Sequence, residues 1–338
     1  MTTFEHDLAS SGRLLGIYPM KTLSIIVPVY NEEKTLSYTH ERLIKLAAVP
    51  NLSSRLEIIY VNDGSQDKTP IILDRFQVTG AGGVDIKVVH FARNFGHSAA
   101  VTAGLIESAG DRITIIDADL QDPPELIPEM VALIERGWDV VYGQRSVRLG
   151  ETHFKRLTAW LFYRILNLLT GVVIPRDTGD FRVITREVRD ALLSCHDQEP
   201  FLRGLVAWVG FQQKAFPYVR EPRRYGTTKY PFSKMVKFAN NAILSFSSSP
   251  LRIAIHAGLV GMGLSVLIGL WALWARFTGR AVSGWTSLLD GTLIGQSFIL
   301  LCIGFIGSYT ARIYRQVQGR PRFIIRQRKD WPDRESGV

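Results

Sequence analysis

The chain has few cysteines and no leader-like N-terminus. Of its 338 residues only Cys195 and Cys302 are cysteine, and Cys302 lies in an apolar segment, so a disulfide framework is not expected. Residues 1–20 contain acidic side chains and no continuous apolar core, unlike a secretory signal peptide. No zinc-finger spacing or RNA-binding signature accompanies the net charge of +9, so we expect no nucleic-acid partner. The basic balance favours phosphorylated substrates or an anionic membrane surface.

Two long runs near the C-terminus also lack charge. Ile253–Ala275 and Gly291–Ala311 contain no Asp, Glu, Lys or Arg. Each run is long enough to cross a hydrocarbon core of about 30 Å as a helix. Three tryptophans stand where an aromatic belt would lie at the outer interface, namely Trp271, Trp274 and Trp285. We therefore predict a two-helix transmembrane hairpin over residues 251–314, with two buried core helices as the alternative.

Basic side chains are distributed unevenly around this hairpin. The connecting loop carries Arg276 and Arg280, whereas the segment after it includes Arg312, Arg315, Arg320, Arg322, Arg326, Arg328 and Lys329. Because cytoplasmic segments carry the excess of Lys and Arg, we predict that the catalytic domain and both termini are cytoplasmic, at the inner membrane. We divide the chain into an N-terminal extension (1–20), a catalytic domain (21–230), an interfacial amphipathic segment (231–250), the hairpin (251–314) and a basic cytoplasmic tail (315–338).

The catalytic domain is predicted to have an α/β fold. Strand-like apolar runs at 23–30, 56–61, 86–91, 113–116 and 140–142 alternate with segments of helical spacing at 35–48, 69–77, 93–109 and 124–136. This alternation is typical of a mainly parallel sheet with helices on both faces. Ligands of such sheets bind beyond the carboxyl ends of the strands, where polar clusters occur in this sequence.

One of these clusters is the carboxylate pair Asp117 and Asp119. Within a strand their side chains would point to opposite faces, but at its end the backbone turns and both can approach one ion. Mg²⁺ and Mn²⁺ prefer carboxylate oxygens, and a nucleoside diphosphate needs such a cation to offset its charge. Gln121 can add an amide oxygen. The alternative is an acidic loop, or a cap of the helix that begins near Pro124.

Seven short motifs follow one another along the chain. They are Ile26–Glu33 (IVPVYNEE), Val61–Asp67 (VNDGSQD), Arg93–His97 (RNFGH), Asp117–Glu125 (DADLQDPPE), Tyr142–Arg148 (YGQRSVR), Gly179–Arg182 (GDFR) and Gly226–Tyr230 (GTTKY). Ser245–Arg252 (SFSSSPLR) then leads into the hairpin. As an ordered set, over roughly residues 21–315, they resemble the polyprenyl-phosphate glycosyltransferases of glycosyltransferase family 2, which include bactoprenol glucosyltransferases and dolichol-phosphate mannose synthases.

The resemblance implies a GT-A fold, with a Rossmann-like, mostly parallel sheet followed by interfacial helices and two C-terminal transmembrane helices. It also implies a Mg²⁺ or Mn²⁺ ion held by Asp117, Asp119 and Gln121. Asn62 stands where many relatives have Asp, so its role is the least defined. The residues expected to contact the nucleotide-sugar donor are Pro28, Tyr30, Asn31, Glu32, Asp63, Gly64, Ser65, Arg93, Asp117 and Ala118.

Arg145 and Arg156 match positions that bind the acceptor phosphate in the dolichol-phosphate mannose synthases. Guanidinium groups bind phosphate bidentately and reduce the repulsion between an anionic acceptor and an anionic donor. Solvated surface arginines are the alternative interpretation. The other candidates for the acceptor phosphate are Arg148, Lys155, Arg182 and Lys229.

Asp180 is expected near the sugar, where it orients the acceptor or a sugar hydroxyl, or else forms a structural salt bridge with Arg182. His97 is interpreted as a structural or supporting residue, because no acidic residue or further His or Cys stands at ligand spacing near it. The predicted catalytic set is Asp119, Asp180, Arg145 and Arg156.

The resemblance therefore implies inverting transfer of a sugar from a nucleotide-diphosphate sugar to a polyprenyl phosphate, for modification of cell-envelope glycans such as lipopolysaccharide. A phosphate monoester has a second pKa of about 6, so it is mainly dianionic at pH 7 and needs little help from a base. Positioning and charge stabilisation would then lower the barrier. The two-span architecture favours UDP over GDP and undecaprenyl over dolichyl phosphate, whereas the sugar stays open.

Two other interpretations are a processive polysaccharide synthase and an inactive, membrane-tethered nucleotide-sugar-binding protein. The first usually has a Gln-x-x-Arg-Trp motif and more spans, and no Arg-Trp dipeptide occurs in this chain. The second is disfavoured because the carboxylate pair and the acceptor arginines are present. Similar bacterial proteins further imply a homo-oligomer, such as a tetramer.

Overall fold

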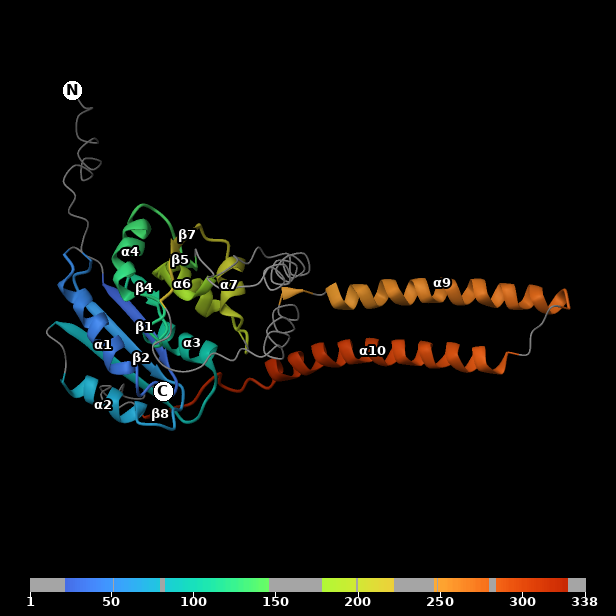
Figure 1. Cartoon of the computed structure of the whole chain (residues 1–338), viewed down its shortest axis with the longest axis horizontal. Helices are drawn as coiled ribbons and strands as arrows, with labels where there is room; N and C mark the ends of the chain where they lie inside the picture. Colours follow the sequence, from blue (N-terminus) through green and yellow to red (C-terminus); the bar gives the residue numbers. More distant parts are fainter. Residues whose placement is uncertain are drawn as a thin grey trace, which may run out of the picture.

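The computed structural model describes residues 22–50, 52–79, 83–145, 178–198, 200–221, 246–247, 249–279 and 284–327. This part of the chain contains one eight-stranded sheet, with two long helices extending away from it (Figure 1). The strand order is β7-β5-β6-β4-β1-β2-β3-β8. The strands are β1 (Leu23–Val29), β2 (Leu56–Asn62), β3 (Val84–Phe91), β4 (Arg112–Ile115), β5 (Val140–Arg145), β6 (Thr178–Thr185), β7 (Gln213–Tyr218) and β8 (Ile325–Gln327).

The central four strands, β4-β1-β2-β3, are parallel, so their carboxyl ends lie at one edge of the sheet. On one side β6 is antiparallel to both β4 and β5, and β7 returns parallel to β5. On the other side β8 pairs antiparallel with β3. The predicted α/β fold with a mainly parallel sheet is thus confirmed at its centre, and the antiparallel pairings lie in the flanks.

Helices cover both faces because the central strands bury both sets of alternating side chains. Leu23, Ile25 and Val27 of β1 pack toward one face, and Ile26 packs toward the other. On that second face a Cβ at Gly104 would lie 2.2 Å from Cγ2 of Ile26, so the helix that contains Gly104, α3 (His97–Glu107), approaches β1 closely. The first face carries α1 (Leu36–Lys45), α2 (Thr69–Thr79) and α4 (Ile127–Glu135), and the second carries α3 (His97–Glu107), α6 (Arg186–Ser194) and α7 (Leu202–Trp208). Short 3₁₀ turns follow α1 (Leu46–Ala48) and precede α4 (Pro124–Leu126).

The two long C-terminal helices are α9 (Ser249–Phe277) and α10 (Trp285–Val317), which run side by side away from the sheet (Figure 1). Leu251–Trp271 and Ile294–Val317 are long and apolar enough to cross a membrane, and their side chains are not buried inside the protein. The alternative of two buried core helices therefore does not hold. The side on which the hairpin begins and ends stays a prediction.

The chain returns from α10 to the sheet, whereas the sequence predicted only a basic tail there. Arg322 Nη2 donates to the carbonyl of Cys195 over 2.6 Å. Phe323 stacks on Phe91 with ring centroids 4.9 Å apart, and the Ala92 amide donates to the carbonyl of Ile324. The segment predicted as a basic tail therefore supplies the edge strand β8. The N-terminal extension and all but the end of the predicted interfacial segment, 231–250, lie outside the described residues.

Candidate active site

The loops after β1 and β2 hold each other at the carboxyl edge of the sheet. Asn31 adopts a φ of +54°, which Asn tolerates better than most residues. Its amide donates to Oγ of Ser65 over 2.9 Å, and the Gln66 amide donates to Oδ1 of Asn31 over 2.9 Å. Asn31 and Ser65, both predicted to contact the nucleotide-sugar donor, are thus in direct contact although 34 positions separate them.

Three other residues predicted to contact the nucleotide-sugar donor lie at the end of β1 or just after it. Pro28 is buried in the strand opposite Val61, whereas Tyr30 is 45% exposed. The amide of Glu32 donates to Oγ1 of Thr69, at the start of α2. Tyr30 therefore presents its ring to solvent at the strand edge, while Pro28 and Glu32 join the loop to the core and to α2.

Asp63 joins the β2 loop to the loop that precedes α3. Its buried carboxylate accepts the amides of Phe95 over 2.6 Å and Gly96 over 2.9 Å, and also the side-chain amide of Asn94. Burial raises the pKa of Asp63, and the two backbone amides oppose that rise. In this structure the carboxylate holds a loop, so its contact with a nucleotide stays a prediction.

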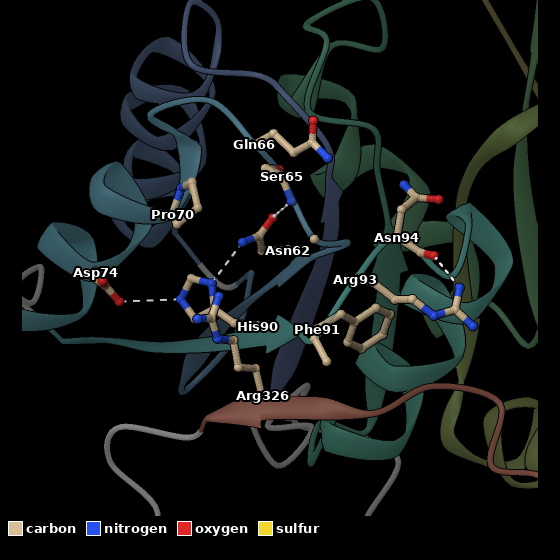
Figure 2. A pocket seen from close by; sticks show the side chains of 12 residues that line it. Asn62, Ser65, Gln66, Pro70, Asp74, His90, Phe91, Arg93, Asn94 and Arg326 are labelled. Atoms are coloured by element: carbon tan, nitrogen blue, oxygen red, sulfur yellow. Dashed lines mark hydrogen bonds and ion pairs between the residues drawn. The ribbon is translucent and has the colours of Figure 1, made fainter.

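A pocket of about 440 Å³ opens beside these loops (Figure 2). Its lining includes the predicted donor residues Gly64, Ser65 and Arg93, together with Arg326 of β8. The Arg93 guanidinium lies over the ring of Phe95 at 4.1 Å and donates to the carbonyl of Asn94. Strand β8 therefore forms part of a pocket whose other walls belong to β2, β3, α2 and the loops that follow β2 and β3.

Asn62 occupies the inner wall of this pocket. Its Oδ1 accepts the Ser65 amide over 3.0 Å, so its Nδ2 is the donor to Nδ1 of His90, 2.8 Å away. The opposite ring nitrogen of His90 lies 3.3 Å from Asp74 (Figure 2). Asn62 thus fixes the loop that carries Ser65 without adding the charge that an Asp would bring.

The loop after β4 carries the carboxylate pair. Ala118 is buried and its carbonyl accepts the Thr39 hydroxyl over 2.9 Å, which anchors the loop to α1. Leu120 has a φ of +61°, and this turn lets the Gln121 amide donate to Oδ1 of Asp119 over 3.1 Å. Strained backbone of this kind for a branched residue is typical of functional loops.

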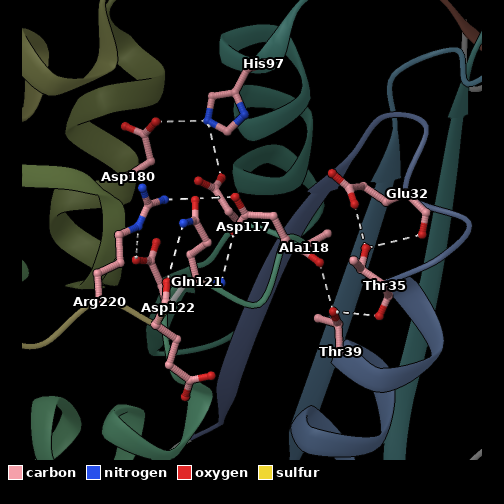
Figure 3. A network of polar contacts seen from close by, with 12 residues as sticks. Glu32, Thr35, Thr39, His97, Asp117, Ala118, Gln121, Asp122, Asp180 and Arg220 are labelled. Carbon is pink, nitrogen blue, oxygen red and sulfur yellow. Dashed lines mark hydrogen bonds and ion pairs between the residues drawn. The ribbon is translucent and has the colours of Figure 1, made fainter. Parts of the chain in front are cut away.

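His97, at the start of α3, and Asp180 of β6 complete a charged cluster around Asp117 (Figure 3). His97 Nε2 lies 3.0 Å from Oδ2 of Asp180 and 4.0 Å from Oδ1 of Asp117. Arg203 of α7 donates to both oxygens of Asp180, over 2.9 and 3.1 Å. The predicted partner Arg182 is farther from Asp180, at 3.5 Å, and also donates to the Gly179 carbonyl.

This arrangement shifts three pKa values. Burial raises the pKa of Asp117 to about 6, helped by nearby carboxylates and opposed by His97. Burial would lower the pKa of His97, but its hydrogen bond to Asp180 and the charges of Asp117 and Asp180 raise it to about 9. Burial would raise the pKa of Asp180, but Arg203 and His97 hold it well below its usual value. Asp180 is therefore ionised, and His97 carries the proton at pH 7.

The residues at this edge fit a divalent cation. No group of three or more His, Cys, Asp or Glu side chains at metal-binding geometry occurs in the part of the chain that the structure describes. Mg²⁺ is commonly held by one or two carboxylates together with substrate phosphates, which Asp117 and Asp119 can match. The mutual repulsion of Asp117 with Asp119, Asp122 and Asp180 is also the kind that a bound cation relieves.

The acceptor candidates are only partly described. Arg145 ends β5 and places Nη2 2.9 Å from where a Cβ of Gly179 would stand. Arg182 is buried, and burial lowers its pKa, so it lies in the protein interior and not at the surface. Four other candidates lie outside the described residues, namely Arg148, Lys155, Arg156 and Lys229.

Comparison with known proteins places the chain in a family. The model of glycosyl transferase family 2 matches residues 24–193. The chain belongs to glycosyl transferase family 2. An uncharacterized glycosyltransferase of Bacillus subtilis is 43% identical over 305 residues, covering 90% of this chain and 93% of that protein. A prophage-derived bactoprenol glucosyl transferase of Shigella flexneri is 35% identical over 306 residues, covering 90% and 97%.

Among solved structures, this chain is similar to glucosyl-3-phosphoglycerate synthase from Mycobacterium tuberculosis, at 21% identity and a TM-score of 0.45. That match covers 66% of this chain and 78% of the synthase. A mannosyltransferase of Pyrobaculum calidifontis gives 18% identity and a TM-score of 0.43, over 85% and 87% of the two chains. The family match and the relatives of similar length together establish this protein as a glycosyltransferase.

Proposed function

We propose that this glycosyltransferase transfers glucose from UDP-glucose to undecaprenyl phosphate, with inversion at the anomeric carbon. The observation that carries the proposal is the match to a bactoprenol glucosyl transferase over 90% of this chain and 97% of that protein. A polyprenyl phosphate is confined to the membrane, and a hairpin of two apolar helices would anchor the catalytic domain beside it.

The donor would lie along the carboxyl edge of the sheet. The pocket beside Gly64, Ser65 and Arg93 would take the nucleoside, and the diphosphate would extend toward Asp117 and Asp119. A Mg²⁺ or Mn²⁺ ion bound by these carboxylates, with Gln121 nearby, would offset the charge of the departing diphosphate.

On the acceptor side, Arg145 would bind the lipid phosphate, together with residues of the segment that begins at position 146. Asp180 would face the sugar, held in one orientation by Arg203 and His97. Because the acceptor is already an anion at pH 7, Asp180 would accept a hydrogen bond from a sugar hydroxyl and need not remove a proton.

We further propose that the protein lies in the inner membrane with its catalytic domain and both termini in the cytoplasm, as the distribution of basic residues indicates. Glycines along α9 have open space where a Cβ would stand, so another helix could approach them closely. On that ground we propose a homo-oligomer, such as the tetramer that the family resemblance implies. Light scattering of the detergent-purified protein tests the assembly.

The decisive experiment is transfer of radiolabelled sugar from a panel of UDP- and GDP-sugars to undecaprenyl phosphate, by full-length protein in detergent with Mg²⁺ or Mn²⁺. A butanol-extractable product from UDP-glucose alone is the expected result. A product from another donor would replace glucose in the proposal. No product from any donor, with neither UDP nor GDP bound, would refute it.

A further inference from the structure

The segment that leaves β7 is bound to the loop that carries the carboxylates. The Tyr218 hydroxyl donates to Oδ1 of Asp122, a carboxylate that is 0% exposed. The Glu221 amide donates to the carbonyl of Gln121 over 3.0 Å, and the Gln121 side-chain amide donates back to the Glu221 carbonyl over 3.4 Å. These contacts hold residues 218–221 against the loop that carries the carboxylates.

Arg220 lies at the centre of this contact (Figure 3). Its Nε donates to Oδ1 of Asp122 over 3.3 Å, and its Nη2 lies 4.0 Å from Oδ2 of Asp119. The Arg220 side chain is 24% exposed and that of Asp119 is 13% exposed, so a ligand can reach both. A guanidinium therefore stands next to one of the two carboxylates that would hold the cation.

The position of Arg220 has two electrostatic consequences. A unit positive charge near Asp119 opposes binding of a dication to the same carboxylate. The same guanidinium favours a phosphate, because planar N–H donors bind phosphate oxygens bidentately with charge assistance. When a cation and a phosphate bind together, the cation repels the Arg220 guanidinium from Asp119, and the phosphate offers it a partner of opposite charge.

We propose that Arg220 exchanges partners during the reaction cycle, pairing with Asp119 and Asp122 while the site is empty and with a phosphate oxygen once the cation and substrate are bound. The inference rests on the proposed function and adds a residue to it. The phosphate belongs either to the donor diphosphate or to the lipid acceptor, which share this chemistry. Arg220 thereby keeps the carboxylates neutralised between turnovers and lowers their affinity for a cation that arrives without substrate.

The test compares Arg220→Gln and Arg220→Lys with a control variant, Arg42→Gln. Arg42 bridges Glu221 and Glu125, so its loss loosens the same segment without removing charge beside Asp119. Each full-length protein is assayed in detergent for Mn²⁺ binding by electron paramagnetic resonance, for binding of UDP with Mn²⁺ by calorimetry, and for the KM of undecaprenyl phosphate.

Arg220→Gln should bind Mn²⁺ alone more tightly, by roughly three- to tenfold, because a unit charge near the dication is gone. It should also lose a charge-assisted phosphate contact, a loss of roughly ten- to a hundredfold in affinity. A weaker UDP affinity assigns the phosphate to the donor, whereas unchanged UDP affinity with a raised KM assigns it to the lipid. Arg220→Lys should return Mn²⁺ affinity to the wild-type value.

Three results would overturn the inference. The first is Mn²⁺ affinity in Arg220→Gln that is unchanged or that falls as in Arg42→Gln, because Arg220 would then only support the loop. The second is tighter Mn²⁺ binding in Arg220→Gln while both the UDP affinity and the KM of undecaprenyl phosphate stay at their wild-type values. The third is wild-type protein that binds neither Mn²⁺ nor UDP, which refutes the proposed function and this inference with it.

Discussion

Replacing Gly64 by Ala should damage both the fold and the donor site, because two loops meet at this residue. Gly64 has a φ of +69°, and an added Cβ would stand 2.3 Å from the carbonyl carbon of Arg93 and 2.5 Å from the amide nitrogen of Asn94. Both neighbours are backbone atoms, so no side-chain rotation can relieve the clash. The loop before α3 must move, and with it the amides that Asp63 holds.

The size of the effect follows from two contributions. A left-handed backbone costs an L-residue about 1–2 kcal/mol, and overpacking a tight contact costs about 1–3 kcal/mol more. Gly64→Ala should therefore lower the free energy of unfolding by about 2–5 kcal/mol. Gly137 supplies a matched control, since its φ is +100° but an added Cβ meets nothing within 4 Å. Gly137→Ala should show only the first contribution.

Thermal unfolding of the detergent-purified protein, followed by tryptophan fluorescence at a single scan rate, measures the difference. At roughly 2–4 °C per kcal/mol for a domain of this size, Gly64→Ala should unfold several degrees below Gly137→Ala. Calorimetry with UDP and Mn²⁺ should also reveal weaker binding in Gly64→Ala alone. Equal melting temperatures for the two variants, together with wild-type affinity for UDP, would show that the loops tolerate the extra carbon.

Three further predictions concern the charged groups. The pKa of His97 is raised to about 9 in the folded protein, against about 6.5 when unfolded, so its stabilising contribution is complete below pH 6.5 and is lost as pH rises through 9. The difference in unfolding free energy between wild type and His97→Gln should therefore shrink over that pH range. A constant difference would argue against the ion pair with Asp180. Asp119→Ala should abolish transfer and weaken Mn²⁺ binding by resonance spectroscopy, and near-normal turnover would exclude a metal ligand at this position. Arg145→Ala should raise the KM of undecaprenyl phosphate roughly ten- to a hundredfold while leaving UDP affinity within a factor of about two; equal losses of both would indicate a donor or folding role instead.

Much of the fold could be predicted from the sequence because the central strands are buried on both faces. Such strands read as continuous apolar runs, and the expected strand at 23–30 differs from β1 by one residue. The short β8 could not be predicted in this way. Ile325, Arg326 and Gln327 carry no apolar period, and their pairing with β3 depends on where α10 delivers the chain.

The site could be predicted only where a motif carried it. Asp117 and Asp119 stand together in the sequence, but His97 and Asp180 meet across 83 positions, and no local pattern reports their contact. For the same reason Arg182, two residues from Asp180, was expected as its partner, while Arg203 makes the closer, two-point contact. Contacts between residues of different helices and strands, such as Arg203 and Asp180, can be identified only once the arrangement of the folded sheet is known.

The position of β8 has a consequence for how the protein is made. A ribosome synthesises the residues of β3 long before those of β8, and both apolar helices come between them. Until synthesis passes residue 327, the outer edge of β3 presents unpaired amides and carbonyls, the kind of edge that recruits strands from other chains. The newly made domain therefore completes its sheet only after the hairpin has emerged, and a chain that terminates within α10 would leave this edge uncovered.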